Sequence, residues 1–228
     1  MHNQPEERKP ALTGALLAGI LGSLLMYSGD LLLYGDTTLA EITPESVVAT
    51  MRSLDSIRVI AGGAVGPFAA LLYCIGFYGV SRLVRPERQV LRTAVFLLFC
   101  LGVIYGGAYH SQFPHLAFAV SENGMGTIAA TSDYINLLSL GAFAPWALAS
   151  ILFQYAVMRG RTFCRKRAAL LAPLPLALLI IPMMKLPAPF LVLVAGGWYS
   201  LMFTVFFAVC LAEARYSGGE ALRMGAKE

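Results

Sequence analysis

The stretch ALTGALLAGILGSLLMYSGDLLLY, residues 11–34, carries a single charged side chain, Asp30. A bilayer core about 30 Å thick is crossed by about 20 residues of α-helix, so this stretch is long enough to span a membrane. Arg8 and Lys9 precede it, as basic residues precede the apolar core of a secretion signal, but the apolar run is longer than such a core. We therefore interpret it as an uncleaved first transmembrane helix.

The composition extends this interpretation to the whole chain. Of its 228 residues, 57% are hydrophobic and 13% are charged, and the mean hydropathy is +0.68. Soluble domains carry about 25% charged residues. The charges also gather in short clusters, such as residues 82–92 and 159–167, between long apolar runs. The sequence therefore predicts an all-α integral membrane protein, and its net charge of +4 does not indicate nucleic-acid binding, because the basic residues mark loop ends.

Six apolar runs are expected to form one transmembrane domain, residues 11–214, between a cytoplasmic N-terminus (1–10) and a cytoplasmic tail (215–228). The predicted spans are residues 11–35, 57–82, 92–111, 133–158, 168–186 and 189–212. In the first outer loop, Thr43 followed by Pro44 and Glu45 is a good helix start, with apolar residues at helical spacing behind it. A short amphipathic helix is therefore expected there.

The basic residues predict the orientation of the chain. With the N-terminus in the cytoplasm, all 17 Lys and Arg residues except Arg52, Arg58 and Lys185 fall on the cytoplasmic side. The positive-inside rule thus predicts that both termini are cytoplasmic. We expect a multi-pass protein of the cell membrane, which in a bacterium is the cytoplasmic (inner) membrane.

Two parts of the chain resemble each other. The segment DSIRVIAGGAVGPFA, from Asp55, aligns with DYINLLSLGAFAPWA, from Asp133, and the alignment pairs Pro67 with Pro145. The first and third spans align as well, and this places Asp30 opposite His110. The pattern predicts three repeated helical hairpins, the alternative being a chance match between spans rich in small residues.

Ionisable side chains inside a membrane are costly, so each one suggests a function. Asp30 lies in the outer half of the first span, with Tyr34 one helical turn later, and Arg58 opens the second span at a similar depth. A purely structural charge pair between Asp30 and Arg58 is the simplest explanation. The other explanation is a binding site.

The third span ends in YHSQFPH, which brings His110, Gln112 and His115 to the outer boundary. Three interpretations stay open: interfacial residues, a proton-coupled or polar-solute site, and a metal site completed by Asp30 or Asp133. A separation of five residues with Pro114 between does not place two histidines on one helix face. No metal site is therefore assigned, and Asp30, His110 and His115 are only weak candidates for one.

The polar residues of the first four spans are expected to line one outward-facing cavity. The candidate binding residues are Asp30, Tyr34, Arg58, His110, Gln112, His115, Asp133 and Asn136. The last two spans are almost bare of polar residues, so the third hairpin is expected to act as a hydrophobic brace. The four cysteines show no disulfide spacing, and free thiols are expected.

Three function classes follow from this pattern. The first is a transporter-like protein whose cavity binds an ion, a small solute or a lipid headgroup. The second is an intramembrane hydrolase or transferase, metal-dependent or not, that acts on a lipid or lipid-linked substrate. The third is a non-catalytic membrane partner subunit. GxSxG, HExxH, P-loop and CxxC motifs are absent, and the sequence leaves the cofactor unknown. The expected partners are the bilayer and the ligand, and a homo-oligomer is compatible with the sequence.

Overall fold

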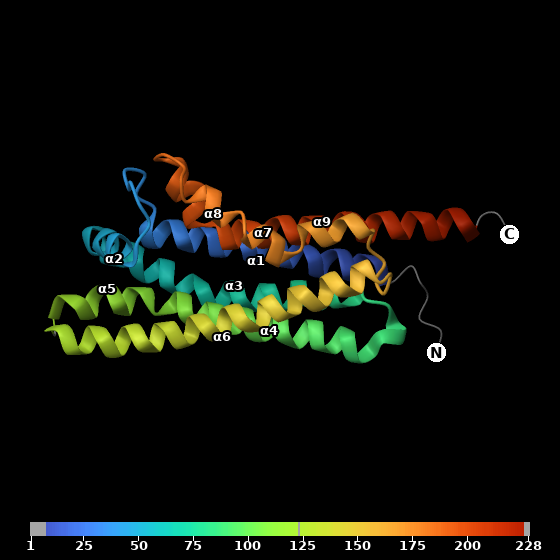
Figure 1. Ribbon diagram of the computed structural model, residues 1–228, viewed down its shortest axis with the longest axis horizontal. Coiled ribbons are helices and arrows are strands. Elements are labelled where there is room, and N and C mark those ends of the chain that lie inside the picture. Colours follow the sequence, from blue (N-terminus) through green and yellow to red (C-terminus); the bar gives the residue numbers. More distant parts are fainter. Residues whose placement is uncertain (1–7, 123, 226–228) are drawn as a thin grey trace.

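The computed structural model describes residues 8–122 and 124–225, and most of them are helical. Figure 1 shows the long helices lying side by side along one axis. The α-helices are α1 (Arg8–Tyr34), α2 (Pro44–Ser53), α3 (Ser56–Arg82), α4 (Gln89–Ser111), α5 (Phe113–Glu122), α6 (Gly124–Met158), α7 (Pro173–Ala177), α8 (Ile180–Met183) and α9 (Trp198–Gly225). Two 3-10 helices, η1 (Pro86–Arg88) and η2 (Lys166–Leu171), and a π-helix, η3 (Leu191–Gly196), lie between them.

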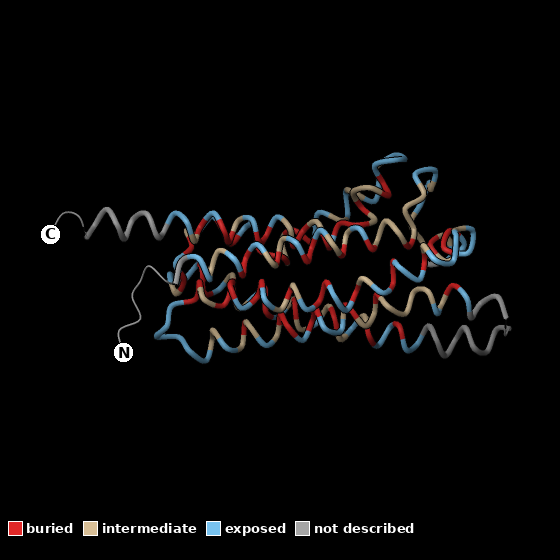
Figure 2. The backbone as a smooth tube through the Cα atoms, turned by 180° about the vertical axis from the view of Figure 1, so that it is seen from behind, coloured by how far each residue is buried: buried red, intermediate tan, exposed pale blue. Residues whose placement is uncertain are grey.

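The all-helical fold predicted from the sequence is confirmed for the described residues. Five of their helical stretches are long and apolar enough to cross a membrane: Pro10–Tyr34, Ser56–Arg82, Pro86–Phe118, Asp133–Met158 and Trp198–Tyr216. Large apolar side chains such as Leu21, Phe68 and Leu140 are exposed on the outside of the bundle, while Figure 2 shows the buried positions facing its interior. An apolar exterior on helices of this length indicates a multi-pass membrane protein.

The last two predicted spans differ from the sequence expectation. Residues 168–186 form no continuous helix but the succession η2, α7 and α8, which is interrupted at Ala172, before Pro173, and at Leu178 and Leu179, before Pro182. Proline lacks a backbone N–H and its ring clashes with the preceding turn, so closely spaced prolines break a helix into short pieces. The predicted span 189–212 begins as the π-helix η3 and continues as α9.

The expected amphipathic helix in the first outer loop is present as α2. Thr43 caps it: its side chain accepts a hydrogen bond from Ser46 N–H (3.1 Å), and the Ser46 hydroxyl oxygen accepts one from Thr43 N–H (2.9 Å). Asp55 caps α3 in the same manner, accepting from the N–H groups of Ile57 and Arg58. These caps fix where α3 begins, and with it the position of Arg58 beside the end of α1.

The centre of the bundle is filled with aromatic rings. Phe77 of α3 stacks on Phe99 of α4 with 4.3 Å between ring centroids, and both belong to the main cluster of buried apolar residues. From α9, Phe206 and Phe207 pack against them at 5.9 and 5.0 Å. This core holds α3, α4 and α9 together in the middle of the bundle, on one side of the cavity described below.

The beginning of α1 and the end of α9 lie at the same end of the bundle (Figure 1). The loops before α4 and after α6 meet there, because Arg85 N–H donates to the Arg161 carbonyl and Phe163 N–H donates to the Leu83 carbonyl, each at 2.9 Å. The opposite end carries α2, α5 and the turn that follows α8. Most of the described basic loop residues therefore gather at one end.

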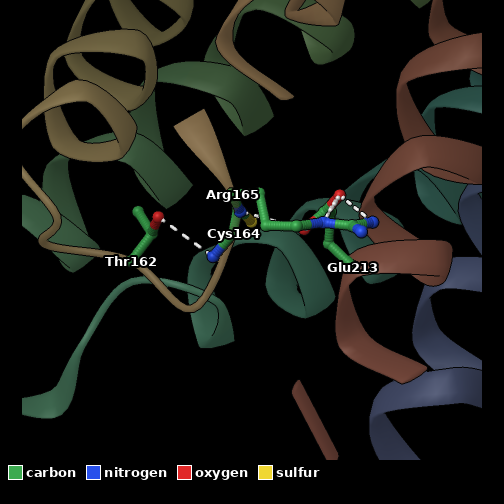
Figure 3. Close-up of polar contacts among 4 residues, drawn as sticks. All are labelled: Thr162, Cys164, Arg165 and Glu213. Carbon is green, nitrogen blue, oxygen red and sulfur yellow. Dashed lines mark hydrogen bonds and ion pairs between the residues drawn. The ribbon is translucent and has the colours of Figure 1, made fainter. Parts of the chain in front are cut away.

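An ion pair ties the loop after α6 to α9 at this basic end (Figure 3). Arg165 donates to the Glu213 carboxylate through Nη2 at 2.7 Å, through Nε, and through its backbone N–H at 2.9 Å. The Glu213 side chain is only 4% exposed. Both of its oxygens accept several hydrogen bonds from Arg165, so this carboxylate serves to anchor the loop.

Candidate functional site

Three polar side chains from three helices meet toward the end of the bundle that carries α2. Asp30 lies one turn before the end of α1, His110 next to the end of α4, and Ser200 in the first turn of α9. Oδ1 of Asp30 is 3.3 Å from Nε2 of His110, and the Ser200 hydroxyl donates a 2.8 Å hydrogen bond to Oδ2 of Asp30. The side chains of His110 and Asp30 are 7% and 14% exposed, so a carboxylate and an imidazole are largely buried side by side.

The imidazole of His110 is held without a hydrogen bond. Its contact with Asp30 is not aligned for one, and neither ring nitrogen has a hydrogen-bond partner within the described part of the chain. Two glycines make room for the ring: a Cβ atom at Gly29 would lie 2.9 Å from Cε1 of His110, and one at Gly66 would lie 3.1 Å from its Cβ. A buried polar group without a partner costs free energy, which singles out this imidazole as a candidate for function.

A cavity of about 520 Å³ lies beside this group of three residues. Small-molecule sites have volumes of about 300–1,000 Å³ and mostly apolar walls with a few polar groups. Here the apolar wall includes Met26 of α1, Val103 of α4, Ile135 of α6 and Ile180 of α8. The polar lining residues are Asp30, Tyr34, Thr43, Tyr73, Tyr109, His110, Asn136, Tyr199 and Ser200.

Aromatic rings line the side of the cavity formed by α3, α6 and α9. Phe143 and Tyr199 meet at 5.1 Å, and Phe203 lies between Trp146, at 6.1 Å, and Tyr73, at 5.3 Å. All five residues line the cavity. Much of the contact between α6 and α9 here is therefore made by side chains that also face the cavity.

One face of α1 is polar and is directed at α9 and the π-helix before it. Ser23 hydrogen-bonds Thr204 at 2.7 Å, and Asp30 accepts from Ser200. The hydroxyls of Tyr27 and Tyr34 donate to the carbonyls of Leu193 and Gly196, at 2.7 and 2.8 Å. Two phenols of α1 thus donate to carbonyls of η3. The contacts fix α1 against the segment that carries Ser200.

The structure separates the eight predicted site residues into two groups. Asp30, Tyr34, His110 and Asn136 line the cavity. The repeat and hydropathy patterns indicate these residues but do not say which of them lie close together. Arg58, Gln112, His115 and Asp133 are not among the described residues that line it. Asp133 and His115 are exposed, and Gln112 forms the C-terminal cap of α4.

Arg58 has a different role from the expected charge partner of Asp30. Its guanidinium donates to three backbone carbonyls at the end of α1: Nε to Leu32 at 3.1 Å, and Nη2 to Leu31 at 2.9 Å and to Gly35 at 3.1 Å. No ion pair joins Asp30 and Arg58 among the residues described. The last carbonyls of a helix lack partners within it and attract cations, so Arg58 stabilises the end of α1.

The arrangement limits the chemistry of the site. Ser200 donates its proton to Asp30 and not to His110, so the three residues lack the serine-to-imidazole hydrogen bond that activates a nucleophilic serine. Of the weak metal candidates, Asp30 and His110 meet, but His115 is exposed and does not line the cavity. Throughout residues 8–122 and 124–225, no group of three or more His, Cys, Asp or Glu side chains is placed to hold a metal ion.

Several cavity residues were not predicted from the sequence. Ser200 and Tyr199 belong to the hairpin expected to be a hydrophobic brace, and that expectation is wrong, because Ser200 bonds Asp30 directly. Tyr73 and Trp146 were also missed as lining residues. A signal for the α1 contacts exists in the sequence, since Ser23, Tyr27, Asp30 and Tyr34 follow one another at intervals of three and four and therefore share one helix face.

Comparison with known proteins gives a family but no activity. A model described as "Family of unknown function (DUF6796)" matches residues 1–216. The chain belongs to this family. No curated protein and no solved structure matches the chain. The family match covers α1 to α9 as far as residue 216, so every described cavity residue lies inside the matched region.

Proposed function

We propose that the protein binds a small amphiphilic molecule in the cavity, with the apolar body of the molecule against the aromatic and aliphatic wall and its polar group at Asp30, His110 and Ser200. The observation that carries this proposal is the largely buried carboxylate of Asp30, 3.3 Å from the imidazole of His110, at the edge of a cavity of about 520 Å³. A ligand that supplies a hydrogen bond or a charge to Asp30 would offset the cost of burying this carboxylate.

The proposed topology has six membrane crossings with both termini in the cytoplasm. It is supported by the beginning of α1 and the end of α9 lying at one end of the bundle, where loop arginines such as Arg85 and Arg161 also lie. The interrupted segment η2–α7–α8 then serves as the fifth crossing. By the positive-inside rule this end faces the cytoplasm, so the cavity opens toward the outer side of a cell membrane.

The proposed repeat relates the hairpin α1–α3 to the hairpin α4–α6. In each hairpin a glycine of the first helix packs against the second helix: a Cβ at Gly22 would lie 3.1 Å from the Ala69 carbonyl, and one at Gly102 would lie 2.9 Å from the Ala142 carbonyl. Asp30 and His110, which are equivalent in the repeat alignment, meet in space. Residues near an axis that relates two repeats would meet in this way.

A transporter-like role is favoured over an intramembrane enzyme. A general base needs a nitrogen that can reach the substrate, but Nε2 of His110 faces Asp30, and Nδ1 lies 3.3 Å from where a Cβ at Gly66 would be, between α3 and α4. The same groups suit a switch, because binding or release of the ligand changes the charge balance between α1, α4 and α9.

Photolabelling in lipid nanodiscs tests the binding proposal. The probes share one diazirine-bearing alkyl chain and end in trimethylammonium, carboxylate or hydroxyl. We expect at least one probe to label cavity residues of α4, α6 or α9, as mapped by peptide mass spectrometry. Gly106→Leu should strongly reduce this labelling, since a Cβ at Gly106 has only Ala142 within 4 Å among the described residues and the added side chain would occupy part of the cavity.

Gly14→Leu is the matched control for this experiment. Gly14 lies on α1, is exposed, and a Cβ there would meet no atom within 4 Å. The control should be labelled like the unmodified protein. If none of the three probes labels the cavity, or if Gly106→Leu is labelled as strongly as Gly14→Leu, the cavity is no binding site and the proposal fails.

A further inference from the structure

The charge of the cavity wall indicates which class of ligand it takes, provided that the cavity binds a ligand as proposed above. Asp30 is the one Asp or Glu among the described lining residues, and none of those residues is Lys or Arg. The nearby cation, Arg58, is bound to backbone carbonyls and does not line the cavity. Apart from His110, nothing in the described wall can supply positive charge to a ligand.

The carboxylate of Asp30 has capacity left for a ligand. Among the described residues, Oδ2 accepts one hydrogen bond from Ser200, while Oδ1 makes an unaligned contact with His110. An ionised carboxylate inside a membrane protein is costly without a countercharge. A cationic group entering the cavity would provide that countercharge.

The aromatic rings of the wall fit the same kind of ligand. Tyr73, Phe143, Trp146, Tyr199 and Phe203 line the same cavity as Asp30 and contact one another there. Aromatic faces attract organic cations, and recognition of quaternary ammonium groups by clustered rings is a common use of this attraction. The apolar remainder of the wall suits the hydrocarbon part of such a molecule.

We propose that the ligand is an organic cation, an amine or quaternary ammonium group on an apolar body, whose charge is received by Asp30 and the surrounding rings. A carboxylate or phosphate ligand would meet Asp30 without a fixed cation to balance it. A neutral ligand would leave the carboxylate unbalanced. The expected order of affinity is therefore cation, then neutral molecule, then anion.

Protons compete with the cation for the same site. Protonation of Asp30 removes the attracting charge, and protonation of His110 supplies a competing one 3.3 Å away. The titratable and hydroxyl groups that share this part of the cavity are Asp30 and Tyr34 of α1, Tyr73 of α3, Tyr109 of α4, and Tyr199 and Ser200 of α9. None of them adds a positive charge, so protonation of Asp30 or His110 weakens cation binding.

The three probes described above test this inference with matched hydrocarbon chains. The trimethylammonium probe should label the cavity at a concentration about tenfold or more below that of the carboxylate probe, which corresponds to about 1.4 kcal/mol. Asp30→Asn should remove the preference for the cationic probe, while Asp36→Asn, which neutralises a carboxylate of the loop after α1 bonded to Thr38, should keep it. Each variant is first checked for an unchanged elution volume on size exclusion.

A pH series on the unmodified protein gives a second measurement that needs no variant. Labelling by the trimethylammonium probe should fall at acid pH, while labelling by the hydroxyl probe should change little. If the carboxylate or hydroxyl probe labels the cavity as well as the cationic probe, the cation inference is overturned and the binding proposal stands. If no probe labels the cavity, both fail.

Discussion

The Ser200 hydroxyl donates a 2.8 Å hydrogen bond to Oδ2 of Asp30, although the two residues are 170 positions apart in the sequence. This contact joins α9 to α1, and Asp30 in turn lies 3.3 Å from His110 of α4. Three helices thus share one buried carboxylate. A change in its charge or in its ligand would act on all three helices at once, which is the property that a binding-driven conformational change requires.

Ser200→Ala should destabilise the protein through the loss of this hydrogen bond. Hydrogen bonds to charged groups contribute about 1.5–3 kcal/mol, so the midpoint of thermal unfolding in detergent should fall measurably. Ser28→Ala is the matched control, because the Ser28 hydroxyl is exposed and donates only to the Leu24 carbonyl of its own helix. Equal midpoints for the two variants would contradict an energetically important contact between Ser200 and Asp30.

Gly66→Ala should disturb the position of His110. The added Cβ would lie 2.7 Å from the Gly107 carbonyl and 3.1 Å from Cβ of His110, so α3 and α4 must separate or the imidazole must move. Overpacking of this kind costs about 1–3 kcal/mol. Gly14→Ala should instead be neutral or stabilising by up to about 1 kcal/mol, since Ala favours a helix more than Gly does. Thermal unfolding and probe labelling of both variants measure the difference.

Arg58→Gln should reduce stability without removing ligand binding. Its guanidinium makes three hydrogen bonds to carbonyls at the end of α1, and glutamine cannot replace all of them. The expected loss is about 1.5–3 kcal/mol. Labelling of the cavity below the unfolding temperature should persist. Complete loss of labelling in a variant that still elutes as a folded protein would show that Arg58 belongs to the binding site after all.

Breaking the ion pair at the basic end should destabilise the protein strongly. Glu213→Ala removes the carboxylate to which Arg165 donates, and removal of one member of a buried pair costs about 3–5 kcal/mol. We expect a value near the lower limit, because the Arg165 side chain is 35% exposed. The double variant Arg165→Met with Glu213→Leu should recover much of the loss, as measured by thermal unfolding. A double variant no more stable than Glu213→Ala would show that the loss does not come from burying the Arg165 charge without the Glu213 carboxylate.

Cys164 should react slowly with alkylating reagents at neutral pH. Burial, with a further contribution from the Glu213 carboxylate, raises the pKa of this thiol to about 12, against about 8.5 for a free cysteine. Between about pH 8.5 and the raised value, the folded state therefore keeps the thiol proton that the unfolded chain loses. The stability linked to this thiol is complete below about pH 8.5 and is lost as the pH rises toward the raised value.

Iodoacetamide labelling of the intact protein, followed by mass spectrometry of the Cys164 peptide, measures this reactivity. The rate should be low at neutral pH, rise as the pH is increased, and reach that of an ordinary thiol once the protein is unfolded in detergent. A rate at neutral pH equal to that of the unfolded protein would show that the thiol is neither buried nor shifted.

Much of the fold could be predicted because membrane insertion depends on local composition. Apolar runs such as residues 11–34 and 57–82 must be helical, since only helices pair all their backbone groups within one segment in lipid. The helix α2 was also predictable, because its signals, Thr43 and Pro44, are adjacent in the chain. The broken segment η2–α7–α8 was not, because hydropathy counts apolar side chains and does not register the missing N–H groups of Pro173 and Pro182.

For the site, the sequence by itself determined which side chains are candidates. Asp30 and His110 are ionisable residues within or beside a predicted span, and placing such a group in the membrane costs free energy whichever way its side chain points. Which groups meet was decided by the tertiary structure alone. Arg58 donates to the carbonyls at the end of α1 and not to Asp30. Asp30 instead accepts a hydrogen bond from Ser200, a small hydroxyl residue in a largely apolar stretch of helix. The reason is that helix rotation and neighbour choice are set by packing between distant segments, through close approaches such as Gly66 to Gly107, and no local pattern records them.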